Sequence, residues 1–255
     1  MILRHIRIPP VGLPGTLWLP NAPKGLVAFI QGSGSGRFDA RSSALAAALS
    51  QRGFATLLLD LLTFQEERLR WNIFDIDLLA RRLAGMISWL EAQPDLAELP
   101  LGLFAAGTAA AAALVAAERG PIQAIVTYAG RPDLAQDVLE DVRTPVLLLV
   151  PEAQGPLVTR NQSAYERLKD PKSVRLIPWA NRPSHEADAV AGIVDLAAHW
   201  FTLHLRAALI REEKGHEPLG QSSSPGPHSQ QVPERPQFRR SHDGLRQIGR
   251  HGNDR

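Results

Sequence analysis

The sequence contains no cysteine among its 255 residues. This absence excludes disulfide bonds, thiolate metal ligands and a cysteine nucleophile, and it is compatible with any redox compartment. An excess of charge of one sign is also missing. The first 210 residues carry 20 basic and 20 acidic side chains. Because a nucleic-acid-binding surface normally needs clustered basic charge, we expect no nucleic-acid partner.

Long apolar runs are scarce too. Residues 1–10 alternate apolar side chains with arginine and histidine and lack the apolar segment of a secretion signal. Residues 99–117 are uncharged over nearly the length of a membrane span, but they include Pro100, two glycines and nine weakly hydrophobic alanines. We therefore expect no membrane segment and a cytoplasmic location.

The last 45 residues are poor in bulky apolar side chains, with five of them among six glycines and five prolines. Such a stretch cannot bury enough apolar surface to offset the entropy lost on ordering. The sequence thus predicts one globular domain over residues 1–210 and a disordered tail over residues 211–255.

Short runs rich in valine, isoleucine and leucine alternate with longer segments of helical period, which is typical of a parallel sheet covered on both faces. The runs are 26–30, 55–62, 101–106, 124–129, 145–150 and 174–178. Ahead of them, 2–8 and 16–19 alternate in polarity and are expected to form an antiparallel hairpin at one edge. The fold class is α/β, a three-layer sandwich of about eight mostly parallel strands.

Two helices show a clear apolar stripe. Residues 75–93 repeat leucine or isoleucine every three or four positions, and Pro94 ends the segment. The last helix carries a similar stripe through Trp200 and Phe201, where the tryptophan is expected to pack in the core.

Ligands of open α/β sheets gather at the carboxyl ends of the strands. The first such loop reads Gln31-Gly32-Ser33-Gly34-Ser35-Gly36, and its exposed amides suit an oxyanion or a phosphate. It matches neither the dinucleotide fingerprint nor the P-loop, and a plain turn is an equally good interpretation. The second loop leads from strand 101–106 through Gly107 and Thr108 into an alanine-rich helix, the setting of a nucleophile elbow.

These features together resemble the dienelactone-hydrolase-like members of the α/β-hydrolase family over about residues 10–205. The matching segments, in chain order, are Gly32-Ser33-Gly34-Ser35, the strand and loop 57–63, the helix start 72–76, Gly130-Arg131-Pro132-Asp133 and Trp200-Phe201. The resemblance implies an α/β-hydrolase fold and small esters or lactones as the substrate class.

The resemblance also implies where a catalytic triad would lie. Gly107 falls on the nucleophile position, where it offers no attacking atom, and Thr108 falls where a backbone amide would stabilise the oxyanion. We expect the turn to persist, with open space where a nucleophile's side chain would stand, because glycine adopts such a backbone without strain. Gln154 takes the place of the acid, with Glu152 two residues away.

Arg182 takes the place of the histidine, with His185 three residues later, and Gln31 replaces a histidine that commonly precedes the glycine-rich loop. Arginine stays protonated and cannot act as a general base. The leading hypothesis is a catalytically silent protein that binds a small ligand or a partner. Its cleft residues are expected to be Gln31, Gly32, Ser33, Thr108 and Arg182, and Arg182 favours an anionic ligand.

Two other hypotheses stay open. One is an active ester or lactone hydrolase with a displaced set, in which Ser33 or Ser35 is the nucleophile, His185 the base and Glu152 the orienting acid. The other is an interaction module that works through the tail. No cofactor is expected, and no metal, since the histidines are scattered and His199 and His204 miss the spacing of a helical zinc pair.

Overall fold

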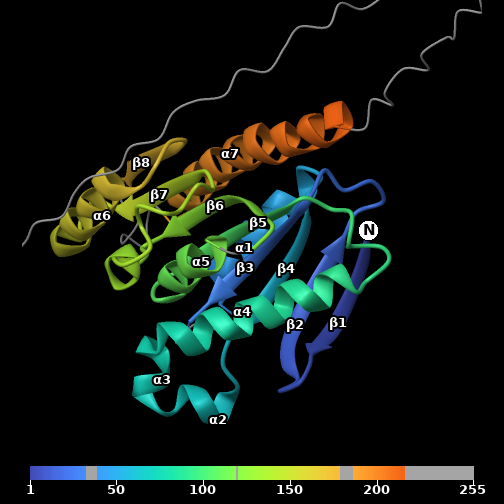
Figure 1. The fold of residues 1–255 in the computed structure, drawn as a ribbon, viewed down its shortest axis with the longest axis horizontal. Helices are drawn as coiled ribbons and strands as arrows, with labels where there is room; N and C mark the ends of the chain where they lie inside the picture. The colour runs from blue at the N-terminus through green and yellow to red at the C-terminus, as the bar shows by residue number, and fades with distance from the viewer. Residues whose placement is uncertain (33–38, 119, 179–185, 216–255) are drawn as a thin grey trace, which may run out of the picture. The chain divides into compact units, whose positions relative to one another are not determined.

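The computed structural model describes residues 1–32, 39–118, 120–178 and 186–215, the last ten of them by their backbone alone. Eight strands form one sheet: β1 (Ile2–Ile8), β2 (Leu13–Leu19), β3 (Leu26–Gln31), β4 (Ala55–Asp60), β5 (Leu101–Ala106), β6 (Ile122–Tyr128), β7 (Val146–Pro151) and β8 (Lys172–Ile177). Their order across the sheet is β1-β2-β4-β3-β5-β6-β7-β8. β2 pairs antiparallel with β1 and β4, and all other neighbours are parallel (Figure 1).

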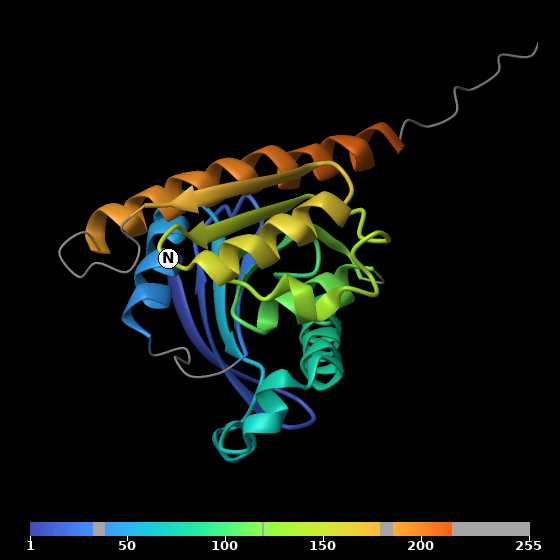
Figure 2. The ribbon, with the colours of Figure 1, turned by 90° about the vertical axis from the view of Figure 1, so that its left-hand side faces the viewer.

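Helices cover both faces of this sheet, as the sequence predicts. They are α1 (Ala40–Gln51), α2 (Phe64–Glu67), α3 (Arg70–Phe74), α4 (Ile76–Glu91), α5 (Ala109–Ala117), α6 (Gly155–Arg167) and α7 (Glu186–Gly215), with a 3-10 turn, η1, at Pro132–Ala135. Buried side chains of α1 and α7 pack on one face, and those of α4, α5 and α6 pack on the other. Figure 2 shows β7 and β8 lying between α7 and α6. The predicted three-layer α/β architecture is confirmed.

Two sequence-based expectations about the strands are wrong. β2 begins at Leu13, so Pro14 and Gly15 belong to the strand and not to the turn, and Gly15 pairs closely with Ile6 of β1. The run 174–178 was expected among the buried strands, but β8 is the outer strand of the sheet and leaves Leu176 half exposed.

The predicted start of the tail lies near the end of the described part of the chain. The expected limit at residue 211 falls inside α7, which continues to Gly215. Residues 216–255 lie outside the described part of the structure. No described helix is both long enough and apolar enough to span a membrane.

The nine residues of α5 are seven alanines, one valine and one leucine, and most of their side chains are fully buried. Their small side chains let the helix lie close to its neighbours. Gly130, after β6, approaches so closely that a Cβ there would stand 2.7 Å from the Cβ of Ala110. This tight packing fixes the position of the α5 N-terminus at the carboxyl edge of the sheet.

Alanine substitutions at two glycines can test how closely the helices pack on the sheet. A Cβ on Gly102 of β5 would lie 2.7 Å from the fully buried ring of Phe201 in α7. Gly102→Ala should therefore reduce the free energy of unfolding by about 1–3 kcal/mol in urea titrations, because the ring has no room to withdraw. The matched control is Gly85→Ala in α4, where a Cβ meets nothing within 4 Å. It should raise stability by up to about 1 kcal/mol through helix propensity, and equal effects at the two positions would contradict the packing described.

Candidate functional site

The connection from β5 to α5 is a tight turn at the carboxyl edge of the sheet. Gly107 has a φ of +57°, a left-handed backbone that favours glycine. A Cβ built on Gly107 would meet no atom of the described residues within 4 Å. The left-handed turn that the sequence predicts is present, and no described atom fills the space beside it.

The loop after β6 supports the turn. The Arg131 amide donates a hydrogen bond of 2.9 Å to the Gly107 carbonyl. The Arg131 guanidinium pairs with the Asp133 carboxylate, with Nη2 at 2.7 Å from Oδ2. The bond from Arg131 holds the pKa of Asp133 below its ordinary value, so this ion pair persists at neutral pH.

A cavity of about 600 Å³ opens at this turn. Gln31 and Gly32 line it from the end of β3, and Gly107 and Thr108 line it from the end of β5. Its apolar wall consists of Phe29, Ile30, Leu45, Ile73, Phe74 and Phe104. The rings of Phe29 and Phe104 are stacked with centroids 4.8 Å apart. The cavity therefore combines apolar side chains with polar groups at strand ends, the composition of many small-molecule sites.

One polar cluster in the lining organises the start of α1. The Asp39 carboxylate caps the helix, since Oδ2 accepts from the Ser42 amide and from the Ser42 hydroxyl, each at 2.8 Å. The Gln31 side-chain amide donates to the same hydroxyl. These bonds fix the Gln31 side chain against α1.

A second polar cluster joins three elements across the cavity. Arg41 donates to Glu186 of α7 at 2.8 Å and to the Tyr128 hydroxyl of β6 at 2.9 Å. Burial raises the pKa of Tyr128, and Arg41 opposes that shift only in part. Tyr128 is thus a neutral phenol at physiological pH, accepting from Arg41 and able to donate its own proton.

Comparison with known proteins places this arrangement in a family. A dienelactone hydrolase of Anabaena variabilis is 41% identical in sequence, with a TM-score of 0.73. The match covers 80% of this chain and 97% of the hydrolase. This chain belongs to the dienelactone hydrolase family.

Other similar proteins agree on the fold. A dienelactone hydrolase-like promiscuous phosphotriesterase from metagenomic libraries is 18% identical, with a TM-score of 0.63, over 80% of this chain and 98% of its own. Two Mycobacterium tuberculosis proteins, from different strains, carry the provisional name phosphoribosyl transferase and are 44% identical over 198 residues. Those residues are 77% of this chain but only 45% of each relative, so the chain spans less than half of their length. No family model matches the chain.

Within this dienelactone hydrolase fold, the residues singled out from the sequence divide into three groups. Gln31, Gly32, Gly107 and Thr108 line the cavity together. Ser33, Ser35, Arg182 and His185 lie outside the described residues.

The third group is Gln154, which takes the acid's position, and the candidate acid Glu152, and neither is part of the described lining of the cavity. Gln154 precedes α6 at its N-cap position and is partly buried, and Glu152 is exposed. The described lining of the cavity contains no histidine, and the described residues contain no cluster of side chains suited to a metal ion.

Sequence reasoning missed Arg41, Tyr128 and Glu186. Tyr128 ends a strand at the carboxyl edge of the sheet. The rule that ligands gather at the carboxyl ends of strands could therefore have found it. Arg41 and Glu186 begin helices far apart in the sequence, and no local pattern indicates that they meet.

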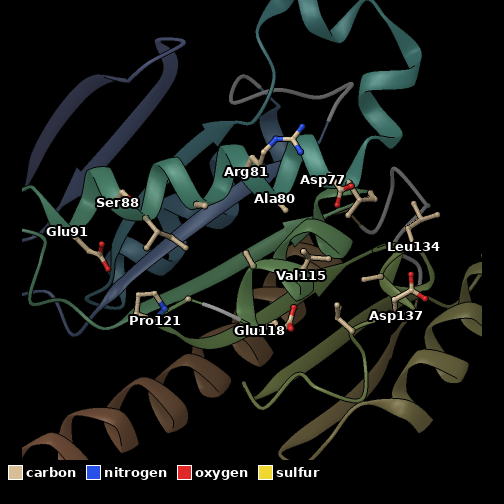
Figure 3. Close-up of a pocket in the computed structure, with 17 residues that line it drawn as sticks. Asp77, Ala80, Arg81, Ser88, Glu91, Val115, Glu118, Pro121, Leu134 and Asp137 are labelled. Atoms are coloured by element: carbon tan, nitrogen blue, oxygen red, sulfur yellow. The ribbon is translucent and has the colours of Figure 1, made fainter.

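A larger cavity of about 730 Å³ lies elsewhere, between α4, α5 and the segment after η1 (Figure 3). Alanines, Ile87 and Val115 contribute its apolar surface, and four carboxylates against one arginine contribute its charge: Asp77, Glu91, Glu118, Asp137 and Arg81. Its described lining contains no left-handed turn like that at Gly107 and no aromatic side chain. The cavity at the ends of β3 and β5 is therefore the candidate functional site of this dienelactone hydrolase family member.

The raised pKa of Tyr128 can be tested by spectrophotometric titration. The chain has two tyrosines, so a Tyr165→Phe background isolates the phenolate absorbance of Tyr128. Because folding raises this pKa, the folded protein holds the phenolic proton more tightly than the unfolded chain. The resulting contribution to stability is present below about pH 10 and is lost as the pH rises through the folded-state pKa.

Arg41→Met should move the Tyr128 ionisation to still higher pH, because Arg41 favours the phenolate. Lys169→Met, at a lysine outside the described lining of the cavity, is the control that should leave it unchanged. A shift to lower pH in Arg41→Met would contradict the described contact.

Proposed function

We propose that this member of the dienelactone hydrolase family does not hydrolyse esters and instead binds a small molecule in the cavity at the Gly107 turn. One observation carries the proposal. The turn that would present a nucleophile has the left-handed backbone for that task and glycine as its residue. Acyl transfer of the usual kind needs an oxygen or sulfur there, and glycine supplies neither.

The neighbouring hydroxyl does not replace the missing one. Thr108 immediately precedes α5 and has an ordinary right-handed backbone with φ −70° and ψ −24°. Its side chain makes no capping hydrogen bond to α5, and the described lining of the cavity contains no histidine that could take its proton. General-base activation needs a partner within hydrogen-bond reach of the nucleophile.

The replacement of all three triad positions supports the same proposal. Gln154 cannot stabilise an imidazolium as a carboxylate does, and Arg182 cannot accept a proton. A cavity is present at this turn, with phenylalanines in its lining and a hydrogen-bonded polar edge. A binding function uses these surviving features and requires no nucleophile.

Activity assays and an active-site probe test the proposal. The wild-type protein should show no turnover of short p-nitrophenyl esters or lactones above buffer, and a fluorophosphonate probe should not label it. Labelling of wild type would overturn the proposal and favour the displaced hydrolase. Ser33→Ala, Ser35→Ala and His185→Ala would then identify its residues by loss of label.

Gly107→Ser makes this test sharper. Its Cβ would meet no described atom within 4 Å, so the variant should fold, with a loss of about 1–2 kcal/mol from the left-handed backbone. It should remain unlabelled, since restoring the hydroxyl alone supplies no base. Rapid labelling of Gly107→Ser would show that a working base and acid survive, against the proposal. Urea titrations check that the variant is folded.

The binding half of the proposal needs its own measurement. Phe74 lines the cavity from α3 and is half exposed, so Phe74→Ala should leave the fold intact. It should weaken the binding of phenyl acetate, followed by ligand-observed NMR, by roughly three- to tenfold through lost apolar contact. Trp71→Ala, at a more exposed residue of the same helix outside the lining, is the matched control and should bind as wild type. Equal binding by wild type and Phe74→Ala would contradict this location.

A further inference from the structure

Four of the ten large apolar side chains that the described residues expose lie on α2, on α3 and in the turn between them. Phe64 is 75%, Leu69 43%, Trp71 69% and Phe74 52% exposed. Both views of the fold show α2 and α3 projecting beyond α4 (Figure 1 and Figure 2). Exposed apolar side chains that gather in one patch mark interaction or ligand sites, whereas scattered ones need no explanation. We call these four residues the outer apolar surface.

The polar side chains of the same segment hold it in place. The Thr63 hydroxyl accepts from the Glu66 amide, and the Glu66 carboxylate accepts from the Thr63 amide at 2.9 Å, which together form a capping box. Glu66 also pairs with Arg82 of α4 at 2.6 Å, and the Asn72 side chain donates to the Glu66 carbonyl at 2.8 Å. The outer apolar surface is therefore fixed by bonds within the protein and needs no ligand in order to form.

This surface is continuous with the cavity at the Gly107 turn. Phe74 belongs to both, because it lines the cavity and is half exposed, and Ile73 beside it lines the cavity as well. Trp71 precedes Phe74 by three positions within α3, which places the two side chains on the same side of the helix. An apolar path thus leads out of the cavity over Phe74 and onto Trp71.

The charged residues in the described lining of the cavity already have partners. The Asp39 carboxylate caps α1, Arg41 pairs with Glu186, and Arg131 pairs with Asp133. A charged ligand would have to displace one of these pairs or leave its own charge unpaired in a partly enclosed apolar site, and both are unfavourable. The described lining therefore suits a ligand with a neutral polar group.

We propose that the ligand is an elongated neutral molecule, with its polar end in the cavity and an apolar chain that runs out over Phe74 and Trp71. The Tyr128 hydroxyl lines the cavity and can donate a hydrogen bond to the polar end. The inference rests on the proposed binding function and names the chemical class of the ligand. A chain that covers the outer apolar surface removes it from water, which accounts for its exposure in the unliganded protein.

A homologous series of 2-alkanones tests the inference by isothermal titration calorimetry. These ketones are neutral, carry their polar group near one end and contain no bond that an esterase could hydrolyse. The affinity of the wild-type protein should rise by up to about fourfold for each methylene that becomes buried. 2-Nonanone should therefore bind at least about tenfold more tightly than 2-pentanone.

Trp71→Ala separates contact with the outer apolar surface from general hydrophobicity. It should weaken 2-nonanone about fivefold through lost apolar contact and leave 2-pentanone unchanged, because the short ketone does not reach past Phe74. Trp71→Phe keeps an apolar ring at this position and should bind 2-nonanone nearly as wild type does. Urea titrations check that both variants are folded.

The matched control is Leu176→Ala in β8. Leu176 is 48% exposed, as an apolar residue of the outer apolar surface is, but it lies on another element and does not line the cavity. This variant should bind both ketones as wild type does. Equal weakening of 2-nonanone by Leu176→Ala and Trp71→Ala would overturn the assignment of the chain to α3.

Two other occupants of the outer apolar surface are outcomes of the same experiment. Dimerisation of wild type in sedimentation equilibrium that Trp71→Ala abolishes, without any effect on ketone binding, would overturn the inference in favour of a second copy of the chain. Arg68 and Arg70 are exposed in the same segment, so phosphatidylglycerol vesicles are the other probe. Co-sedimentation with these vesicles that depends on Trp71, again without an effect on ketone binding, would overturn the inference in favour of a lipid surface.

The outcomes also separate this inference from the proposed function. Affinity that does not depend on ketone length, or equal weakening of both ketones by Trp71→Ala, would overturn the extended ligand and leave the proposed binding of a small molecule intact. Ester turnover by wild type would instead overturn the proposed function, whatever the ketones show.

Discussion

The candidate site depends on the close packing of α5 against the sheet at the Gly107 turn. Leaving β5 and entering α5 within two residues requires a left-handed backbone at Gly107. Helix α5 can remain near the sheet because its side chains are small, and Gly130 approaches Ala110 more closely than a Cβ would allow. The bond from the Arg131 amide to the Gly107 carbonyl ties the next loop to the same point.

Glycine suits this turn because a left-handed backbone is strained for a residue with a Cβ. The described start of α5 and the adjoining cavity need no side chain at position 107. In the function proposed above, the cavity at this turn holds a bound ligand and not a reacting one.

Local patterns predicted much of the fold. The continuous apolar strands, the stripe of α4 and the antiparallel hairpin are each visible within a few residues of sequence, because burial of a strand or a helix face imposes its period directly. The errors fall where burial depends on distant neighbours. β8 reads as an inner strand but lies at the edge of the described sheet, and Pro14 and Gly15 read as a turn but pair with β1.

The sequence by itself determined the family-like order of elements, the glycine at the turn and the place of Thr108 before α5. Only the tertiary structure decided that Arg41, Tyr128 and Glu186 meet across one cavity, and that Gln154 and Glu152 do not line it. The physical reason is the distance along the chain between the residues that determine each feature. Backbone conformation at a turn follows from the residue that occupies it, whereas contacts between α1, β6 and α7 follow from how three layers pack.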